Sequence, residues 1–139
     1  MKPLPVDVLA TAMNASVNAA LEVTGIQATG FAIDSRHITP GDVFCALEGE
    51  RVDGHDFAAE AIAAGAVAII TNRDIADVPC LVTDNSLEAL GRLAHWYRTH
   101  ELSATVIAVT GSSGKTTTKD LIADVLPGAV VAARGSFNT

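Results

Sequence analysis

The sequence is poor in aromatic residues and in basic charge. Aromatic side chains make up 4% of the 139 residues while 49% are hydrophobic, so a core must be built mainly from alanine, valine, isoleucine and leucine. This composition suits helices packed on a sheet. The net charge is −7 and no run of like charges occurs, whereas nucleic-acid binding needs a clustered basic face. We therefore expect no nucleic-acid partner.

Cysteines and long apolar runs are also scarce. Cys45 and Cys80 each lie in an apolar stretch, so we expect them to be small buried hydrophobic residues. A metal site would need more ligands at closer spacing. The first residues lack the apolar region of a signal peptide, and the longest apolar runs are far shorter than a membrane span. The sequence predicts a cytoplasmic protein with no membrane partner.

The order of elements predicts an α/β fold in two parts. Residues 1–102 are expected to form a small N-terminal α/β domain, because runs such as residues 66–71 are typical of strands buried on both faces. Residues 103–139 are expected to form the first βαβ unit of a second domain, whose segment T-G-S-S-G-K-T-T at residues 110–117 is typical of a P-loop ATPase domain. Expected helices are residues 6–20, 57–64, a helix after Asn85, and 116–126; expected strands are residues 29–34, 43–47, 66–71, 81–83, 105–109 and 129–133.

Polar residues indicate where two of these helices begin. Asp56 is expected to cap the helix over residues 57–64, and Asn85 the helix that follows it, with Glu88 placed to reach back to Asn85. The apolar face of the second of these helices is expected to consist of Leu87, Leu90, Ala94 and Tyr97.

A glycine-rich segment lies between the expected strand at residues 105–109 and the next helix. Its sequence is T-G-S-S-G-K-T-T, and backbone N–H groups of such a turn can surround a phosphate at a helix N-terminus. Lys115 would reach the β- and γ-phosphates of a nucleotide, and Thr116 would bind Mg²⁺. The strict P-loop pattern is not met, since Val109 occupies the place of its first glycine. The expected ATP-binding residues are Gly111, Ser112, Ser113, Gly114, Lys115, Thr116 and Thr117.

This shorter loop resembles that of the Mur ligases, the ATP-dependent amide-forming enzymes of peptidoglycan synthesis. Two further segments carry the resemblance. I-D-S-R at residues 33–36, followed by P-G-D-V-F-C-A-L at 40–47, is similar to one family segment, and G-E-R-V-D-G-H-D-F at 49–57 is similar to another.

The loop also resembles one branch of the family more than its sister. Ser112 and Ser113, with Lys119 and Asp120, are similar to the branch that adds the terminal dipeptide, whereas the third-residue branch usually has Thr-Asn at the two serines. A-R-G-S-F-N at residues 133–138 points the same way, although Ser136 and Thr139 stand where asparagine is usual.

The resemblance implies a reaction and a set of ligands. ATP activates a peptide carboxylate as an acyl phosphate, which an amine then attacks, with Lys115 and Thr116 as catalytic residues and Mg²⁺ on Thr116. The substrates would be UDP-N-acetylmuramoyl-tripeptide and D-alanyl-D-alanine. The residues implied in substrate binding are Ile33, Ser35, Arg36, Glu50, Arg51 and Val52 at the uridine diphosphate, and Asn138 and Thr139 near the ATP site.

Family members are much longer than this chain, so the resemblance implies an N-terminal fragment that is inactive alone. Its second-domain strands would lack neighbours, so the segment after about residue 102 is expected either to be mobile or to be covered by another copy of the chain, through self-association at the sheet edges. Three alternatives stay open: the sister ligase that adds diaminopimelate or lysine, a non-catalytic domain that binds a UDP-linked ligand, and an unrelated P-loop kinase or GTPase. Val109 and the absence of an Asn-Lys-x-Asp segment argue against the last.

Overall fold

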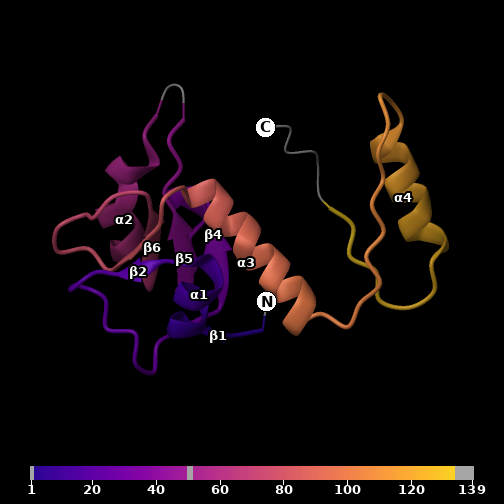
Figure 1. Ribbon diagram of the computed structural model, residues 1–139. Coiled ribbons are helices and arrows are strands. Elements are labelled where there is room, and N and C mark those ends of the chain that lie inside the picture. The colour runs from indigo at the N-terminus through magenta and orange to yellow at the C-terminus, as the bar shows by residue number, and fades with distance from the viewer. Residues whose placement is uncertain (1, 50–51, 134–139) are drawn as a thin grey trace. The chain divides into compact units, whose positions relative to one another are not determined.

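A computed structural model describes residues 2–49 and 52–133. The chain divides into two compact units, Met1–Leu102 and Ser103–Thr139. The first unit contains all the strands found in the described residues, and the second contains one helix. Figure 1 shows the elements of each unit.

The first unit is built on a five-stranded, mostly parallel sheet in the order β2-β7-β6-β5-β4. Strands β4, β5, β6 and β7 are mutually parallel neighbours, and β2 pairs antiparallel with β7 at the edge. A second, two-stranded sheet pairs β1 with β3 antiparallel. The strands span Leu4–Pro5 (β1), Ser16–Val17 (β2), Gln27–Ala28 (β3), Gly30–Ala32 (β4), Asp42–Cys45 (β5), Ala68–Thr71 (β6) and Cys80–Val82 (β7).

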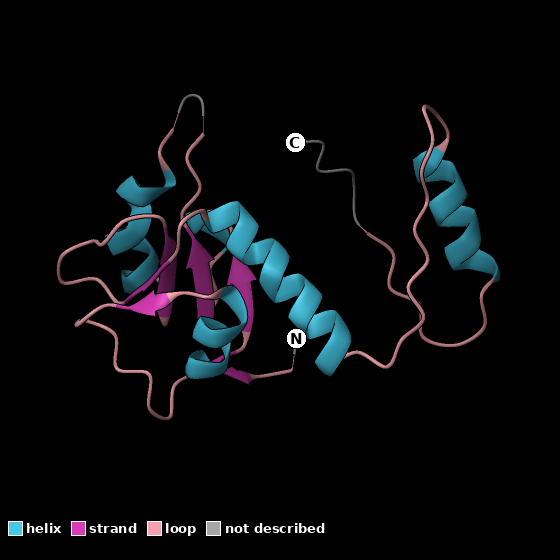
Figure 2. Ribbon diagram, in the orientation of Figure 1, coloured by secondary structure: helices cyan, strands magenta, loops and turns pink. Residues whose placement is uncertain are grey.

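Helices cover both faces of this sheet, as Figure 2 shows. Helices α1 (Val6–Met13) and α3 (Ser86–His100) pack on one face, and α2 (Ala58–Ala63) packs on the other. Alternate residues of β5 face the two layers: Val43 and Cys45 contact the first cluster, and Phe44 contacts the second. All four residues of β5 and of β6 are buried, as the apolar runs predict for central parallel strands.

Both cysteines are buried, which confirms the expectation from their apolar surroundings. Burial raises the pKa of the Cys45 thiol to about 12. Burial likewise raises the pKa of Cys80. Both thiols are therefore structural rather than reactive.

The first helix is shorter than residues 6–20. It ends at Met13 because Asn14 adopts the left-handed conformation (φ 56°) and its N–H closes the helix onto Ala10 O and Thr11 O. Ser16 and Val17 then pair with β7. Tertiary pairing thus overrides the helical propensity of the alanine-rich stretch.

The helical segment over residues 54–63 is capped by a different aspartate from the one predicted. Asp53, not Asp56, caps the 3₁₀ helix η2 (Gly54–Phe57), and its side chain accepts a hydrogen bond from His55 N. Helix α2 continues directly from η2 and has no side-chain cap of its own. The cap therefore lies three residues earlier than predicted, because a 3₁₀ turn precedes the α-helix.

The cap predicted for α3 is confirmed, and its predicted apolar face is right at Leu90 and Tyr97 but wrong at Leu87 and Ala94. Asn85 accepts hydrogen bonds from Leu87 N and Glu88 N. The Glu88 carboxylate lies 3.8 Å from Arg92, one turn along the helix. Leu87 is exposed, as is Ala94, and the side of α3 that faces the sheet carries Ser86, Ala89, Leu90, Leu93 and Tyr97.

The second unit differs more from the expected βαβ unit. Helix α4 (Lys115–Val125) forms as expected, but residues 105–109 and 129–133 are not strands. Val106 is 59% exposed and Val131 is 99% exposed. A parallel pair needs neighbours and helices on both faces, and one helix with no buried residue cannot supply that cover.

Candidate functional site

The glycine-rich loop leads directly into α4. Gly114 precedes the helix in the left-handed conformation (φ +75°), which a side chain with a Cβ rarely adopts. The first hydrogen bond within the helix runs from Thr118 N to Gly114 O, at 2.9 Å. The N–H groups of Lys115, Thr116 and Thr117 precede that bond and are free of helical acceptors. The start of α4 therefore offers three donors to an anion.

The lysine side chain lies over this loop. Lys115 Nζ donates to Gly111 O at 2.5 Å, across the turn. The first turn of α4 carries no acidic residue, so nothing there repels a phosphate. Thr116 is exposed at the same turn, and a hydroxyl oxygen is a suitable ligand for Mg²⁺. These residues fit a nucleotide phosphate with its magnesium ion.

Lys119 has a different place from Lys115. Its Nζ donates to Ala133 O at 2.7 Å and lies 2.8 Å from an oxygen of Asp120. It ties α4 to the segment that follows it and does not lie over the loop. Ser112 and Ser113 are exposed within the loop.

The residues expected at the uridine diphosphate follow two neighbouring strands of the first unit. Strands β4 and β5 are parallel, so the segments after them emerge at the same edge of the sheet. Ile33 follows β4 and is 55% exposed, and Ser35 begins the 3₁₀ helix η1 (Ser35–His37). Val52 lies in the loop after β5 and is 57% exposed. In open α/β sheets ligands bind outside the carboxyl ends of the strands, which is where these three residues lie.

Arg36 is engaged by its neighbour Asp34. Its Nε and Nη2 donate to the two carboxylate oxygens at 2.9 and 2.6 Å. The side-chain and backbone hydrogen bonds from Arg36 hold the pKa of Asp34 well below its usual value. The Arg36 side chain is nevertheless 80% exposed, so this two-bond contact between the guanidinium and the carboxylate lies at the surface. It fixes the turn after β4 and leaves one side of the guanidinium open to solvent.

Four expected ligand residues, Glu50, Arg51, Asn138 and Thr139, lie outside the described residues. The described parts of the loop after β5 show how its ends are held. Glu48 and Asp53 form an antiparallel bridge.

The backbone at the end of this loop packs closely on its beginning. Gly54 N donates to Leu47 O at 2.9 Å. A Cβ at Gly54 would come within 2.7 Å of Leu47 N and O, so only glycine allows this close approach.

Three side chains meet at the base of this loop. Asp53 Oδ1 accepts from His55 N at 3.0 Å and lies 2.5 Å from His55 Nδ1. Arg73 Nη2 donates to Asp53 Oδ2 at 2.8 Å. The bonds from His55 N, the His55 ring and Arg73 together hold the pKa of Asp53 well below its usual value. The His55 side chain is only 2% exposed, so this histidine is part of the structure and not a surface loop residue.

Arg73 and Asn72 had no place in the prediction of the site. Both follow β6 directly, at the same edge of the sheet as the segments after β4 and β5. Asn72 Nδ2 donates to Glu48 Oε1 at 3.2 Å, and Arg73 Nη1 lies 3.7 Å from the same oxygen. The signal that could have found them is their position, since polar residues at the carboxyl end of a buried parallel strand face the ligand edge.

Glu48, Asp53 and His55 bring ligand atoms within 4.8 Å of one another, a spacing that could hold a metal ion. The Arg73 guanidinium already lies against both carboxylates. Its positive charge opposes the binding of a cation there, so the cluster is better described as an arginine-centred ion pair.

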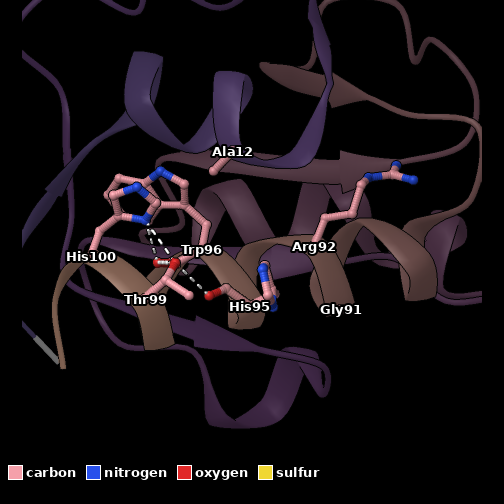
Figure 3. Close-up of a pocket in the computed structure, with 7 residues that line it drawn as sticks. All are labelled: Ala12, Gly91, Arg92, His95, Trp96, Thr99 and His100. Carbon is pink, nitrogen blue, oxygen red and sulfur yellow. Dashed lines mark hydrogen bonds between the residues drawn. The ribbon is translucent and has the colours of Figure 1, made fainter. Parts of the chain in front are cut away.

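A shallow groove lies apart from this edge, between α1 and the C-terminal half of α3 (Figure 3). The His100 ring stacks on Trp96 with centroids 4.8 Å apart. Thr99 Oγ1 donates to backbone oxygens of His95 and Trp96, and Arg92 Nε donates to Met13 O. The hydroxyl of Thr99 and the Nε of Arg92 are thus engaged with the backbone, whereas Arg92 Nη2 is buried without a hydrogen-bond partner among the described residues.

No helix within residues 2–49 and 52–133 is both long enough and apolar enough to cross a membrane.

Comparison with known proteins places these features in a family. A family model described as "Mur ligase family, catalytic domain" matches residues 27–98, just over half of the chain. The UDP-N-acetylmuramoyl-tripeptide–D-alanyl-D-alanine ligase of Escherichia coli is 42% identical over 79% of this chain and 24% of its own length. The UDP-N-acetylmuramoyl-L-alanyl-D-glutamate–2,6-diaminopimelate ligase of Geobacillus thermodenitrificans is 45% identical over 67% of this chain and 19% of its own length.

Solved structures agree with the sequence matches. MurF from Acinetobacter baumannii superposes with a TM-score of 0.79 at 36% identity, over 88% of this chain and 27% of that one. MurF ligase from Thermotoga maritima, solved in complex with ADP, superposes with a TM-score of 0.62 at 42% identity, over 68% of this chain and 22% of that one. The chain spans about a quarter of the length of the curated relatives it matches.

Proposed function

Because the chain belongs to the Mur ligase family, we propose that it is the precursor-binding and phosphate-binding part of an ATP-dependent ligase that joins D-alanyl-D-alanine to UDP-N-acetylmuramoyl-tripeptide. The loop before α4 carries this proposal, since its free N–H groups and the overlying Lys115 ammonium form a site for a nucleotide phosphate. The use of ATP locates the proposed reaction in the cytoplasm.

The proposed reaction has two steps. The tripeptide carboxylate attacks the γ-phosphorus of ATP, which gives an acyl phosphate and ADP. The amine of D-alanyl-D-alanine then attacks the acyl carbon, the C–O bond to phosphate breaks, and the new amide nitrogen loses a proton. The products are the pentapeptide precursor, ADP and phosphate.

The residues of this chain act on the first step. Negative charge spreads over the oxygens of the transferring phosphoryl group, and fixed donors directed at those oxygens lower the barrier. Lys115 Nζ supplies one such charge, and the N–H groups of Lys115, Thr116 and Thr117 supply fixed dipoles. Mg²⁺ bound by the Thr116 hydroxyl would neutralise charge on the β- and γ-phosphates.

The precursor would bind at the carboxyl edge of the first sheet. Ile33 and Val52 present apolar surface there, and Ser35 presents a hydroxyl. Arginine side chains are suited to a diphosphate because their donors form a fork. We assign Arg36, Glu50 and Arg51 to the uridine diphosphate, and Asn138 and Thr139 to the precursor near the ATP site.

Two observations favour the dipeptide-adding branch over its sister. Ser112 and Ser113 have the residue types of that branch. The structure of a diaminopimelate ligase superposes with a TM-score of only 0.58 at 26% identity, against 0.79 and 36% for MurF from A. baumannii. The sister reaction is the second candidate, because the G. thermodenitrificans ligase is as similar in sequence as the E. coli one.

Phosphate release distinguishes these reactions. In the protein as the cell makes it, ATP with UDP-N-acetylmuramoyl-tripeptide should release phosphate only when D-alanyl-D-alanine is added. Release with UDP-N-acetylmuramoyl-dipeptide and diaminopimelate or lysine instead would establish the sister reaction, and release with neither pair would refute both. The 139-residue chain alone should release none, because its loop stabilises the phosphoryl group from one side only.

A further inference from the structure

The carboxylate of Asp34 holds the side chain of Arg36, two residues further along the chain. Asp34 Oδ1 accepts from Arg36 Nε at 2.9 Å, and Asp34 Oδ2 accepts from Arg36 Nη2 at 2.6 Å. The backbone takes part as well, since Arg36 N donates to Asp34 Oδ1 at 3.1 Å. His37 Nδ1, at the end of the same 3₁₀ turn, lies 3.3 Å from Asp34 Oδ2. One carboxylate thus fixes both the backbone and the side chain of Arg36.

This contact leaves a defined part of the guanidinium free. A guanidinium carries five N–H groups, and the contact with Asp34 uses one on Nε and one on Nη2. The second N–H of Nη2 and one N–H of Nη1 are parallel, and such a pair matches two oxygens of a carboxylate or a phosphate. Among the described residues only Asp34 accepts from this side chain, which is 80% exposed. Arg36 therefore presents an ordered pair of donors at the surface.

The turn that carries these two residues lies at the carboxyl edge of the sheet. It follows β4, which is parallel to β5, and it begins next to the exposed Ile33. Ligands of open α/β sheets bind outside this edge. An ion pair as exposed as this one contributes little to the free energy of unfolding, so the contact fixes a conformation more than it stabilises the fold.

We propose that Asp34 is a positioning residue, which holds Arg36 so that its free pair of N–H groups receives the diphosphate of the precursor. This inference rests on the proposed function, which assigns Arg36 to the uridine diphosphate. An arginine loses rotamer freedom when a ligand immobilises it, and an arginine already held by a carboxylate has less freedom to lose. Positioning therefore raises the affinity for the diphosphate, although the negative charge of Asp34 by itself repels an anion.

The two effects of Asp34 have opposite signs, so calorimetry with UDP and the 139-residue chain distinguishes them. Asp34→Asn keeps an oxygen that accepts from Arg36 N, and with it the turn, but its amide nitrogen cannot accept from the guanidinium. UDP should bind about tenfold more weakly to this variant, although a negative charge has been removed. Asp84→Asn is the matched control, because Asp84 is exposed and follows β7 at the same edge. It should bind UDP at least as tightly as the wild type.

Two further measurements assign the effect to the arginine. Arg36→Ala should weaken UDP binding, and Asp34→Asn should add about twofold or less in that background, because no guanidinium remains to be held. In nitrogen–proton correlation spectra, the Arg36 Nε–H should be protected from exchange with water in the wild type and should shift when UDP binds. Asp34→Asn should remove this protection and leave the backbone signals of the turn close to those of the wild type.

The outcomes separate this inference from the proposed function. Equal or tighter binding of UDP by Asp34→Asn would overturn the positioning role and leave the proposed function standing. A full tenfold loss in the Arg36→Ala background, or an Arg36 Nε–H signal that does not move when UDP binds, would also overturn it. No binding of UDP by the wild type would refute the proposed function and this inference with it. If Asp34→Asn does not fold, Asp34→Glu keeps the charge but displaces the carboxylate, and the same non-additivity with Arg36→Ala is required of it.

Discussion

Arg73 Nη2 lies 2.8 Å from Asp53 Oδ2, and this contact joins the end of β6 to the end of the loop that follows β5. The two residues are 20 positions apart in the sequence. Their pairing brings together segments that follow two neighbouring parallel strands, at the edge of the sheet where we propose that the precursor binds.

Lys115→Ala should remove most of the turnover of the protein as the cell makes it, by about a hundredfold or more, because a fixed charge at the phosphoryl group is lost. ATP affinity should fall as well, and both are measured by phosphate release and calorimetry. Lys119→Ala is the matched control, since that lysine lies on the same helix but donates to Ala133 O. Near-normal turnover of Lys115→Ala would show that the loop before α4 is not the phosphate site.

Stability at acid pH should depend on Asp53. Its pKa in the folded protein is lowered, first by the hydrogen bond from His55 N and then by the His55 ring and Arg73. The stability from these contacts is therefore complete above the unfolded-state pKa of about 3.9 and is lost as pH falls toward the lower folded-state value. Denaturant unfolding from pH 6 to pH 3 should show a shallower loss of stability in Asp53→Asn than in the wild type.

Asp56→Asn is the control for that series, because Asp56 is an exposed carboxylate of the same 3₁₀ turn. It should keep the wild-type slope. The Asp34 carboxyl, whose pKa Arg36 also lowers, should leave a residual slope in Asp53→Asn. Identical slopes for Asp53→Asn and the wild type would contradict the assigned role of Asp53.

The two thiols should not react in the folded protein. Cys45 is fully buried and burial raises its pKa to about 12, so the thiolate that attacks a disulfide reagent is scarce at neutral pH. Labelling with an aromatic disulfide should be roughly a hundredfold or more slower than for a free thiol, and should reach two thiols per chain in denaturant. Rapid labelling of one thiol without denaturant would show that the sheet opens.

The 139-residue chain should associate with itself as its concentration rises. Residues 105–109 and 129–133 have the apolar side chains of buried strands, yet Val131 is 99% exposed. Segments of this kind pair with a second copy when they have no partner in their own chain. Sedimentation velocity should detect a dimer that Val131→Asp weakens.

The matched control for self-association is Val125→Asp, at a residue of α4 that is 77% exposed. It should leave association unchanged if strand-like segments form the contact. If both variants weaken self-association equally, the contact between copies depends on exposed apolar surface in general and not on the strand-like segments.

The sequence predicts those parts of the fold that depend on local patterns. The apolar run of residues 66–71 contains β6, and Asn85 caps α3 as expected. Two predictions from local patterns, the length of α1 and the cap before α2, are wrong because contacts in the folded chain override the local preference. Asn14 ends α1 because the next residues pair with β7, and Asp53 displaces Asp56 as a cap because a 3₁₀ turn comes first.

The parts of the fold and of the candidate site that the sequence does not predict depend on contacts between residues far apart in the chain. Residues 105–109 have the composition of a strand, but a strand forms only beside a hydrogen-bonded neighbour, and the described second unit supplies none. The site shows the same division. Lys115 and Gly114 could be identified from their neighbours in the sequence. The position of Arg73 after a buried strand indicates this edge of the sheet, but its partners at positions 48 and 53 could not be identified, because the order of strands brings them to it.

Calorimetric titration of the 139-residue chain with UDP-N-acetylmuramoyl-tripeptide tests the central claim most directly. The account predicts saturable binding of one ligand per chain, competition by UDP, and affinity that falls about fivefold in Ser35→Ala through the loss of one hydrogen bond. No heat and no chemical-shift change with the precursor or UDP at millimolar concentration would contradict it.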